Sequence, residues 1–90
     1  MRVAETRKVT IGFQFVYPLA YASNEGLEPE EIEALDAFER DMVNDGFDPT
    51  CFEFEHDEEG NTVDPYFGFD DLTGIMGNVY DVTFYRFERD

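Results

Sequence analysis

Apolar and polar residues alternate from Lys8 to Val16, as they do in a strand that has one buried face. The apolar set is Val9, Ile11, Phe13 and Phe15, and the set between them is Lys8, Thr10, Gly12 and Gln14. A period of two residues places the two sets on opposite faces of a strand. Tyr17-Pro18 ends this strand, and residues 19–26 are expected to form a loop or a short helical turn.

The spacing of apolar residues becomes helical after Pro29. The residues that recur at intervals of three or four are Ile32, Leu35, Phe38 and Met42. Proline suits the first position of a helix, and the glutamates that follow it are favourable beside the positive end of the helix dipole. Asn44-Asp45-Gly46 supplies a stop signal. The pattern predicts a helix over residues 29–44.

A second strand is predicted over about residues 50–56, where Phe52 and Phe54 share one face. Residues 57–61, Asp-Glu-Glu-Gly-Asn, have the composition of a turn. A partner strand within residues 62–69 would complete a hairpin around this turn, and Pro65 favours an edge position for that strand.

The final strand is expected over about residues 79–87, after a loop at 70–78. Both of its faces carry apolar or aromatic residues. A strand without a polar face is typical of the centre of a sheet, or of a strand covered by another subunit.

This order of elements, strand–helix–strand–strand–strand, predicts a single α+β domain over residues 1–90. We expect a small antiparallel sheet of about four strands, with one helix packed on one face. The helix residues Ile32, Leu35, Phe38 and Met42 should contact a sheet face built from Val9, Ile11, Phe13, Phe15, Tyr80, Val82 and Phe84.

Glu39 falls inside the apolar stripe of the predicted helix. It either lies at the edge of the stripe and reaches water, or is buried and paired with Arg86 from the last strand.

The net charge of the chain says more about its possible partners than any motif does. The chain has 22 Asp and Glu against 6 Lys and Arg, a formal net charge of −16 on 90 residues. From Asp41 to Tyr85 there are twelve carboxylates and no Lys or Arg. Such a surface repels nucleic acid and anionic lipid and favours an electropositive partner. Ten Phe and five Tyr separate this chain from disordered acidic segments, so it should fold.

The sequence offers little for catalysis, and we expect no enzyme, no cofactor and no metal centre. His56 is the only histidine and reads as a solvated turn residue, and Cys51 reads as a small buried apolar residue. Residues 57–64 and 70–74 contain acids near glycine but lack the alternating calcium-loop register, which leaves weak cation binding. A lone cysteine and the lack of a leader or an apolar span lead us to expect the cytoplasm of a host cell.

The acidic surface has three interpretations: solubility, adaptation to high salt, or mimicry of nucleic acid. Same-face strand residues and neighbouring helix turns place carboxylates about 5–7 Å apart, which is the length scale of phosphates along a duplex. We expect the partner-facing patch to include carboxylates of the helix exterior and of the hairpin. They are Glu30, Glu33, Asp41, Asp45, Glu53, Glu55, Asp57, Glu58, Glu59 and Asp64.

Two stretches resemble a family of small acidic proteins encoded by phages and mobile elements. The first is Asn24-Glu25-Gly26-Leu27-Glu28-Pro29-Glu30-Glu31-Ile32 with Leu35-Asp36-Ala37-Phe38, and the second is Pro65-Tyr66-Phe67 with Val79-Tyr80-Asp81-Val82-Thr83-Phe84. The two stretches, residues 24–38 and 65–84, span 35 of the 90 residues, and the resemblance implies no catalytic residues. In size and charge the chain also looks like phage anti-defence proteins, including anti-CRISPR and anti-restriction inhibitors that imitate DNA.

We therefore expect a non-enzymatic, phage-encoded inhibitor or decoy. Its partner would be a basic nucleic-acid-binding host protein, such as a CRISPR effector subunit or a restriction enzyme. One alternative is a homodimeric interaction module whose acidity serves only solubility, and another is an accessory protein that binds a metal or a ligand.

Overall fold

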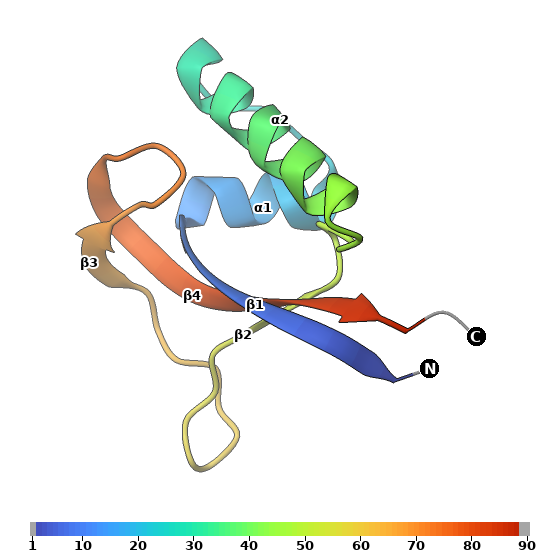
Figure 1. Ribbon diagram of the computed structural model, residues 1–90. Helices are drawn as coiled ribbons and strands as arrows, with labels where there is room; N and C mark the ends of the chain where they lie inside the picture. Colours follow the sequence, from blue (N-terminus) through green and yellow to red (C-terminus); the bar gives the residue numbers. More distant parts are fainter. Residues whose placement is uncertain (1, 89–90) are drawn as a thin grey trace.

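The last strand of the chain, β4 (Met76–Phe87), is the centre of the sheet in the computed structural model, which describes residues 2–88 (Figure 1). β1 (Val3–Gly12) pairs along one edge of β4, and β2 (Phe52–Phe54) and β3 (Tyr66–Phe69) pair with it in succession along the other edge. All three pairings are antiparallel. The predicted α+β fold with a four-stranded antiparallel sheet, and the central place of the last strand, are confirmed.

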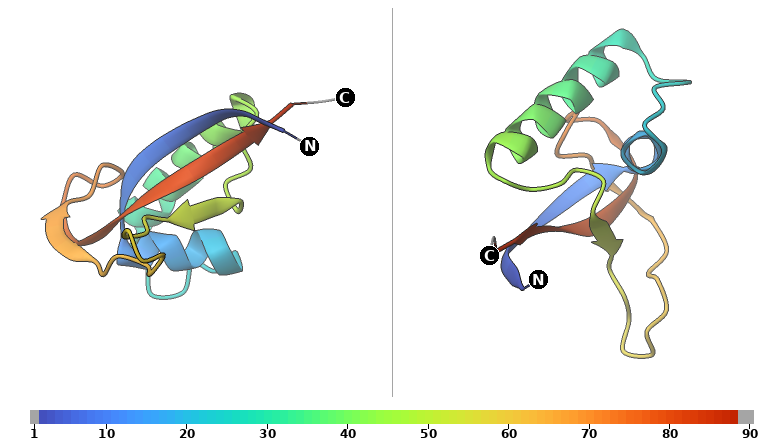
Figure 2. Two further views of the ribbon diagram at one scale, coloured as in Figure 1. Left: turned by 90° about the horizontal axis from the view of Figure 1, so that it is seen from below. Right: turned by 90° about the vertical axis from the view of Figure 1, so that its right-hand side faces the viewer.

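Two helices, rather than the single one expected, cover one face of this sheet. They are α1 (Phe13–Tyr21) and α2 (Pro29–Asn44). Figure 2 shows both helices on the same side of the strands, while the opposite face carries no helix. The predicted bounds of α2 are confirmed, with proline at the start of the helix and two glutamates in its first turn.

The prediction of a strand over residues 8–16 is wrong for the residues after Gly12. β1 begins earlier, at Val3, and the chain turns into α1 at Phe13. A helix here buries Phe15, Val16 and Leu19 together, whereas a strand would place Phe15 and Val16 on opposite faces. That burial offsets the cost of Pro18, which lies inside α1 without an N–H to donate.

The strand limits also differ from those predicted in the C-terminal half. β2 is limited to three residues, and β4 begins at Met76, three residues before the expected start. β3 lies within the predicted range 62–69 but pairs with β4 rather than with β2. The two predicted hairpin arms pair only close to the turn, through a bridge between His56 and Thr62 and a hydrogen bond from the amide of Val63 to the carbonyl of Glu55 at 2.9 Å.

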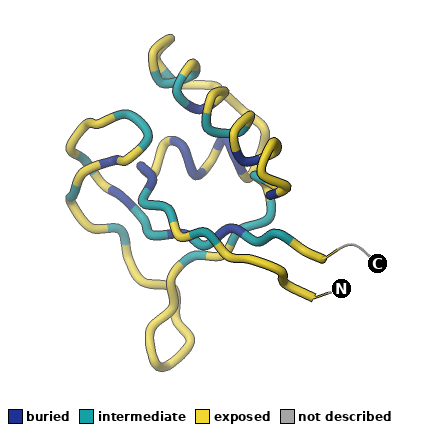
Figure 3. Tube along the Cα trace, viewed as in Figure 1, coloured by how far each residue is buried: buried dark blue, intermediate teal, exposed yellow. Residues whose placement is uncertain are grey.

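The core lies between the helices and the sheet (Figure 3). Its buried members are Ile11, Phe15, Val16, Leu19, Leu35, Met42, Phe47, Val82 and Phe84. Of the four predicted α2 contacts, Leu35 and Met42 are buried, while Ile32 and Phe38 are half-buried. The expectation for Phe13 is wrong, because Phe13 begins α1 instead of lying in the sheet and its side chain is 39% exposed.

Phe47 joins the core through the turn that ends α2. Gly46 takes a φ of +88°, which a side chain would strain, and the amide of Phe47 then donates to the carbonyl of Met42 at 2.8 Å. Arg7 from β1 stacks over the Phe47 ring at 4.4 Å and pairs with Asp45 at 2.9 Å. These contacts fasten the end of α2 to the sheet.

The predicted pair between Glu39 and Arg86 is wrong. Arg86 faces Glu5 at 3.9 Å, and Glu39 is a half-buried residue of α2. Burial raises the pKa of Glu39, and the neighbouring Asp36 raises it further. The first alternative, a carboxyl group at the edge of the apolar stripe, is the one that fits.

We expect Leu35→Ala to lower the free energy of unfolding by about 2–5 kcal/mol, because it leaves a cavity beside the sheet. Val43→Ala is the matched control, since Val43 is 58% exposed on the same helix. Urea unfolding of both variants measures the difference. Equal effects would contradict the packing of α2 described above.

Glu39→Gln should not destabilise the protein at pH 7. A carboxyl group with a raised pKa stabilises the folded state only while protonated, so this contribution is lost as the pH rises through the folded pKa. Glutamine carries no charge at any pH, so the variant should be at least as stable as the wild type at pH 7. This difference in stability should disappear below the ordinary glutamate pKa. Urea unfolding at pH 7 and pH 4, with Glu33→Gln as control, checks this. A marked loss of stability at pH 7 would show that Glu39 has a stabilising partner.

Candidate functional site

The predicted turn at residues 57–61 forms the tip of a projection from the sheet. Figure 1 shows this segment, between β2 and β3, extending away from both helices. Asp57 organises the tip, because its Oδ1 accepts hydrogen bonds from the amides of Glu59 and Asn61, both at 2.9 Å. We call residues 53–64 the acidic hairpin. It contains six of the predicted carboxylates and no Lys or Arg.

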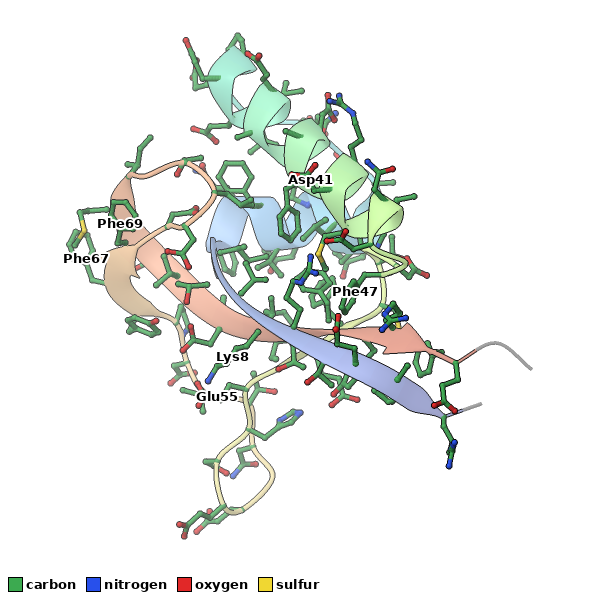
Figure 4. The ribbon with its side chains drawn as sticks, in the orientation of Figure 1. Lys8, Asp41, Phe47, Glu55, Phe67 and Phe69 are labelled. Carbon is green, nitrogen blue, oxygen red and sulfur yellow. The ribbon has the colours of Figure 1, made fainter. Side chains whose placement is uncertain are left out.

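The ten predicted carboxylates fall into two groups rather than one patch. Four lie on or just after α2: Glu30, Glu33, Asp41 and Asp45. Six lie on the acidic hairpin: Glu53, Glu55, Asp57, Glu58, Glu59 and Asp64. Figure 4 shows Asp41 on the helical side of the sheet and Glu55 on the opposite side. Because the two groups lie on opposite sides of the sheet, a flat partner surface could contact only one of them at a time.

Some of these carboxylates already have partners within the protein. Asp45 pairs with Arg7 at 2.9 Å, and Glu55 lies 3.8 Å from Lys8 (Figure 4). Glu53 accepts a hydrogen bond from the Tyr85 hydroxyl at 3.1 Å. Among the ion pairs formed within residues 2–88, none involves the exposed Glu58, Glu59 or Asp64. These three carboxylates therefore keep their charge unpaired within the described residues.

The sheet face without helices carries two tyrosine–carboxylate pairs. Tyr66 donates to Asp81 at 3.2 Å, in parallel with the bond from Tyr85 to Glu53. Burial and the adjacent carboxylate both raise the pKa of each tyrosine, burial being the larger cause. These phenols stay protonated at neutral pH and act as hydrogen-bond donors.

An exposed apolar cluster at the β3–β4 end of the sheet was missed by the sequence analysis. It consists of Phe67, Phe69, Ile75 and Met76, which are 71%, 55%, 59% and 55% exposed. Phe67 and Phe69 lie next to each other at this end in Figure 4. The signal was the run Tyr66-Phe67-Gly68-Phe69, which has too many aromatic residues for an edge strand with one solvated face.

Asp70 is a buried carboxylate that the sequence analysis assigned only to a loop. Its Oδ2 accepts the amide of Gly12 at 2.8 Å, and its Oδ1 accepts the amide of Leu72 at 2.8 Å. A side chain on Gly12 would collide with Asp70 Oδ2. The carboxylate therefore joins the β3–β4 loop to the point where β1 becomes α1.

The residues weighed for metal binding and catalysis lie apart from one another in the described part of the chain. No group of three or more His, Cys, Asp or Glu residues could hold a metal ion within residues 2–88. His56 is exposed at the base of the hairpin tip, which agrees with the prediction of a solvated residue beside the turn. Cys51 is half-buried rather than buried, with a free thiol.

The middle of β4 has strand partners on both of its edges. It bonds to β1 on one edge and to β2 and β3 on the other. The apolar residues on both of its faces are explained by this central position.

Comparison with protein-family models, curated proteins and solved structures finds nothing that matches this chain. The resemblance to small acidic phage proteins stays a prediction. Within residues 2–88, neither helix has the length and apolar character needed to cross a membrane.

We expect Asp70→Ala to lower the free energy of unfolding by about 1–3 kcal/mol, because two backbone amides lose their acceptor. Asp71→Ala is the control, since Asp71 is exposed and only its backbone amide bonds to Thr10. Thermal unfolding compares the two variants. A loss as large in Asp71→Ala would show that charge, rather than the hydrogen bonds, is responsible.

Proposed function

We propose that this chain is a non-enzymatic inhibitor that acts as a nucleic-acid decoy. The acidic hairpin would enter the nucleic-acid-binding site of a basic host protein. The observation that carries this proposal is the turn at residues 57–61, which projects from the sheet with three carboxylates and no Lys or Arg.

The distribution of positive charge supports this proposal. Four of the basic side chains pair with carboxylates near the body of the sheet: Arg2 with Glu88, Arg7 with Asp45, Lys8 with Glu55 and Arg86 with Glu5. They neutralise the sheet and leave the hairpin tip negative. A projecting negative tip steers association with an electropositive groove.

The shape of the hairpin supports it as well. The two arms are bridged at His56 and Thr62, and paired backbones lie about 4.7–4.9 Å apart, so the tip is narrow enough to enter a groove that accepts a nucleic-acid strand. Asp57 holds the tip in one conformation through its two backbone hydrogen bonds, which reduces the entropy lost on binding.

The partner class follows from this chemistry. A host defence protein such as a CRISPR effector subunit or a restriction enzyme carries a basic site for nucleic acid. The inhibitor would be phage-encoded and act in the host cytoplasm, where it binds protein rather than nucleic acid or membrane.

We expect the triple variant Glu58→Gln, Glu59→Gln, Asp64→Asn to bind such a partner more weakly than the wild type by roughly threefold to a hundredfold. Exposed charge pairs contribute about 0.2–1 kcal/mol each. The partner is captured from host lysate at low salt and eluted by a salt gradient, and its affinity is then measured by calorimetry. Duplex DNA should displace the inhibitor.

The matched control is Glu30→Gln, Glu33→Gln, Asp41→Asn on α2, which removes the same number of charges. It should weaken binding less than the hairpin variant does. Binding that is indifferent to salt, to DNA and to the hairpin variant would reject the decoy function. An equal effect of both variants would show that net charge, rather than the hairpin, attracts the partner.

A further inference from the structure

A cavity of about 240 Å³ lies between the β3–β4 loop, the start of α1 and the first turn of α2. Phe13, Ile75 and Met76 supply apolar walls, and Glu31 and Asp70 supply carboxylates. Its rim is accessible, because Phe13, Ile75 and Met76 are 39%, 59% and 55% exposed. The cavity lies apart from the acidic hairpin in sequence and shares no lining residue with it.

Glu31 has an unused hydrogen-bonding atom at this cavity. Its Oε2 is shielded from solvent and has no hydrogen-bond partner in the described part of the chain. Glu31 occupies the third position of α2, where a carboxylate can turn back to a free backbone amide, but Oε2 makes no such bond. A shielded carboxylate oxygen without a donor is costly, so a donor from outside would stabilise it.

The missing donor should carry positive charge. Asp70 adds a second carboxylate to the cavity, and the ion pairs formed among residues 2–88 use Arg2, Arg7, Lys8 and Arg86 elsewhere. Arg40 lies nine positions from Glu31 along α2, about 13 Å at the rise of an α-helix. The cavity is thus lined by two negative charges and no cation; Asp70 is already bonded to the amides of Gly12 and Leu72, which leaves Glu31 as the carboxylate that lacks a donor.

We propose that this cavity binds the guanidinium group of an arginine side chain. The source of that arginine, a basic partner, rests on the function proposed above. Arginine fits the lining because its planar group can form two bonds to a carboxylate and pack on the ring of Phe13, while its aliphatic stem contacts Ile75 and Met76. Lysine is a compact, strongly hydrated point charge and gains less from the aromatic wall.

The size and the ligand set favour one side chain over other occupants. Small-molecule sites usually enclose about 300–1,000 Å³, more than this cavity offers. Calcium takes six to eight oxygen ligands, whereas this cavity presents two carboxylates and no metal-holding group of three acids occurs within residues 2–88. An arginine side chain would be the specific contact of an otherwise charge-driven complex.

The test is an NMR titration of the full chain with N-acetyl-L-arginine amide, which needs no knowledge of the partner. We expect saturable shifts of the amides of Phe13, Glu31 and Ile75 with a millimolar Kd, and binding of N-acetyl-L-lysine amide at least about threefold weaker. Glu31→Gln should abolish the saturable shifts. Glu33→Gln, an exposed change of the same charge on the same helix, should preserve them.

Several outcomes would overturn the assignment. These are shifts that do not saturate, shifts that persist in a folded Glu31→Gln variant, equal affinity for the lysine amide, and displacement of the arginine amide by equimolar calcium. The test is separate from that of the decoy function. Failure here leaves the hairpin result intact, and a hairpin variant that binds its partner normally would reject the decoy while the arginine site stands.

Discussion

The fold depends on β4, because β1, β2 and β3 all form their strand pairs with it and the two helices pack over the face that its Val82 and Phe84 help to form. Without β4 the other strands have no partner, apart from the bridge between His56 and Thr62. The strand at the centre of the sheet thus follows its three partners in the sequence. Long-range pairing of this kind carries a loop-closure cost that only burial of the core can offset.

Two sets of polar contacts, a buried one at Asp70 and a more exposed one at Arg7, hold the helices on this sheet. Asp70 holds the junction of β1 and α1 through the amide of Gly12, and the contacts of Arg7 with Asp45 and Phe47 hold the end of α2. The first contact also places the β3–β4 loop beside α1, and this placement creates the cavity lined by Phe13 and Glu31. A structural carboxylate and a candidate binding site thus share one loop.

The carboxylates differ in whether they have a partner within the protein. Carboxylates near the sheet have partners among the few basic residues or tyrosines, while those at the hairpin tip project into solvent. Solubility alone requires only that the charges be exposed, wherever they lie. The proposed recognition of a basic protein rests on the projecting acidic tip and on the separate cavity lined by Glu31 and Asp70.

The sequence alone determined the features that depend on local chemistry. The bounds of α2, the turn at residues 57–61 and the central character of the last strand follow from period, capping and turn composition. Only the tertiary structure decided that residues 13–16 are helical, since Phe13 and Phe15 fit a strand period and Pro18 argued against a helix. It also decided that β3 pairs with β4, that Phe47 enters the core and that Glu31 meets Asp70 across a cavity. A short apolar segment takes whichever conformation buries its larger face against the elements already present, and that choice depends on residues far away in the sequence.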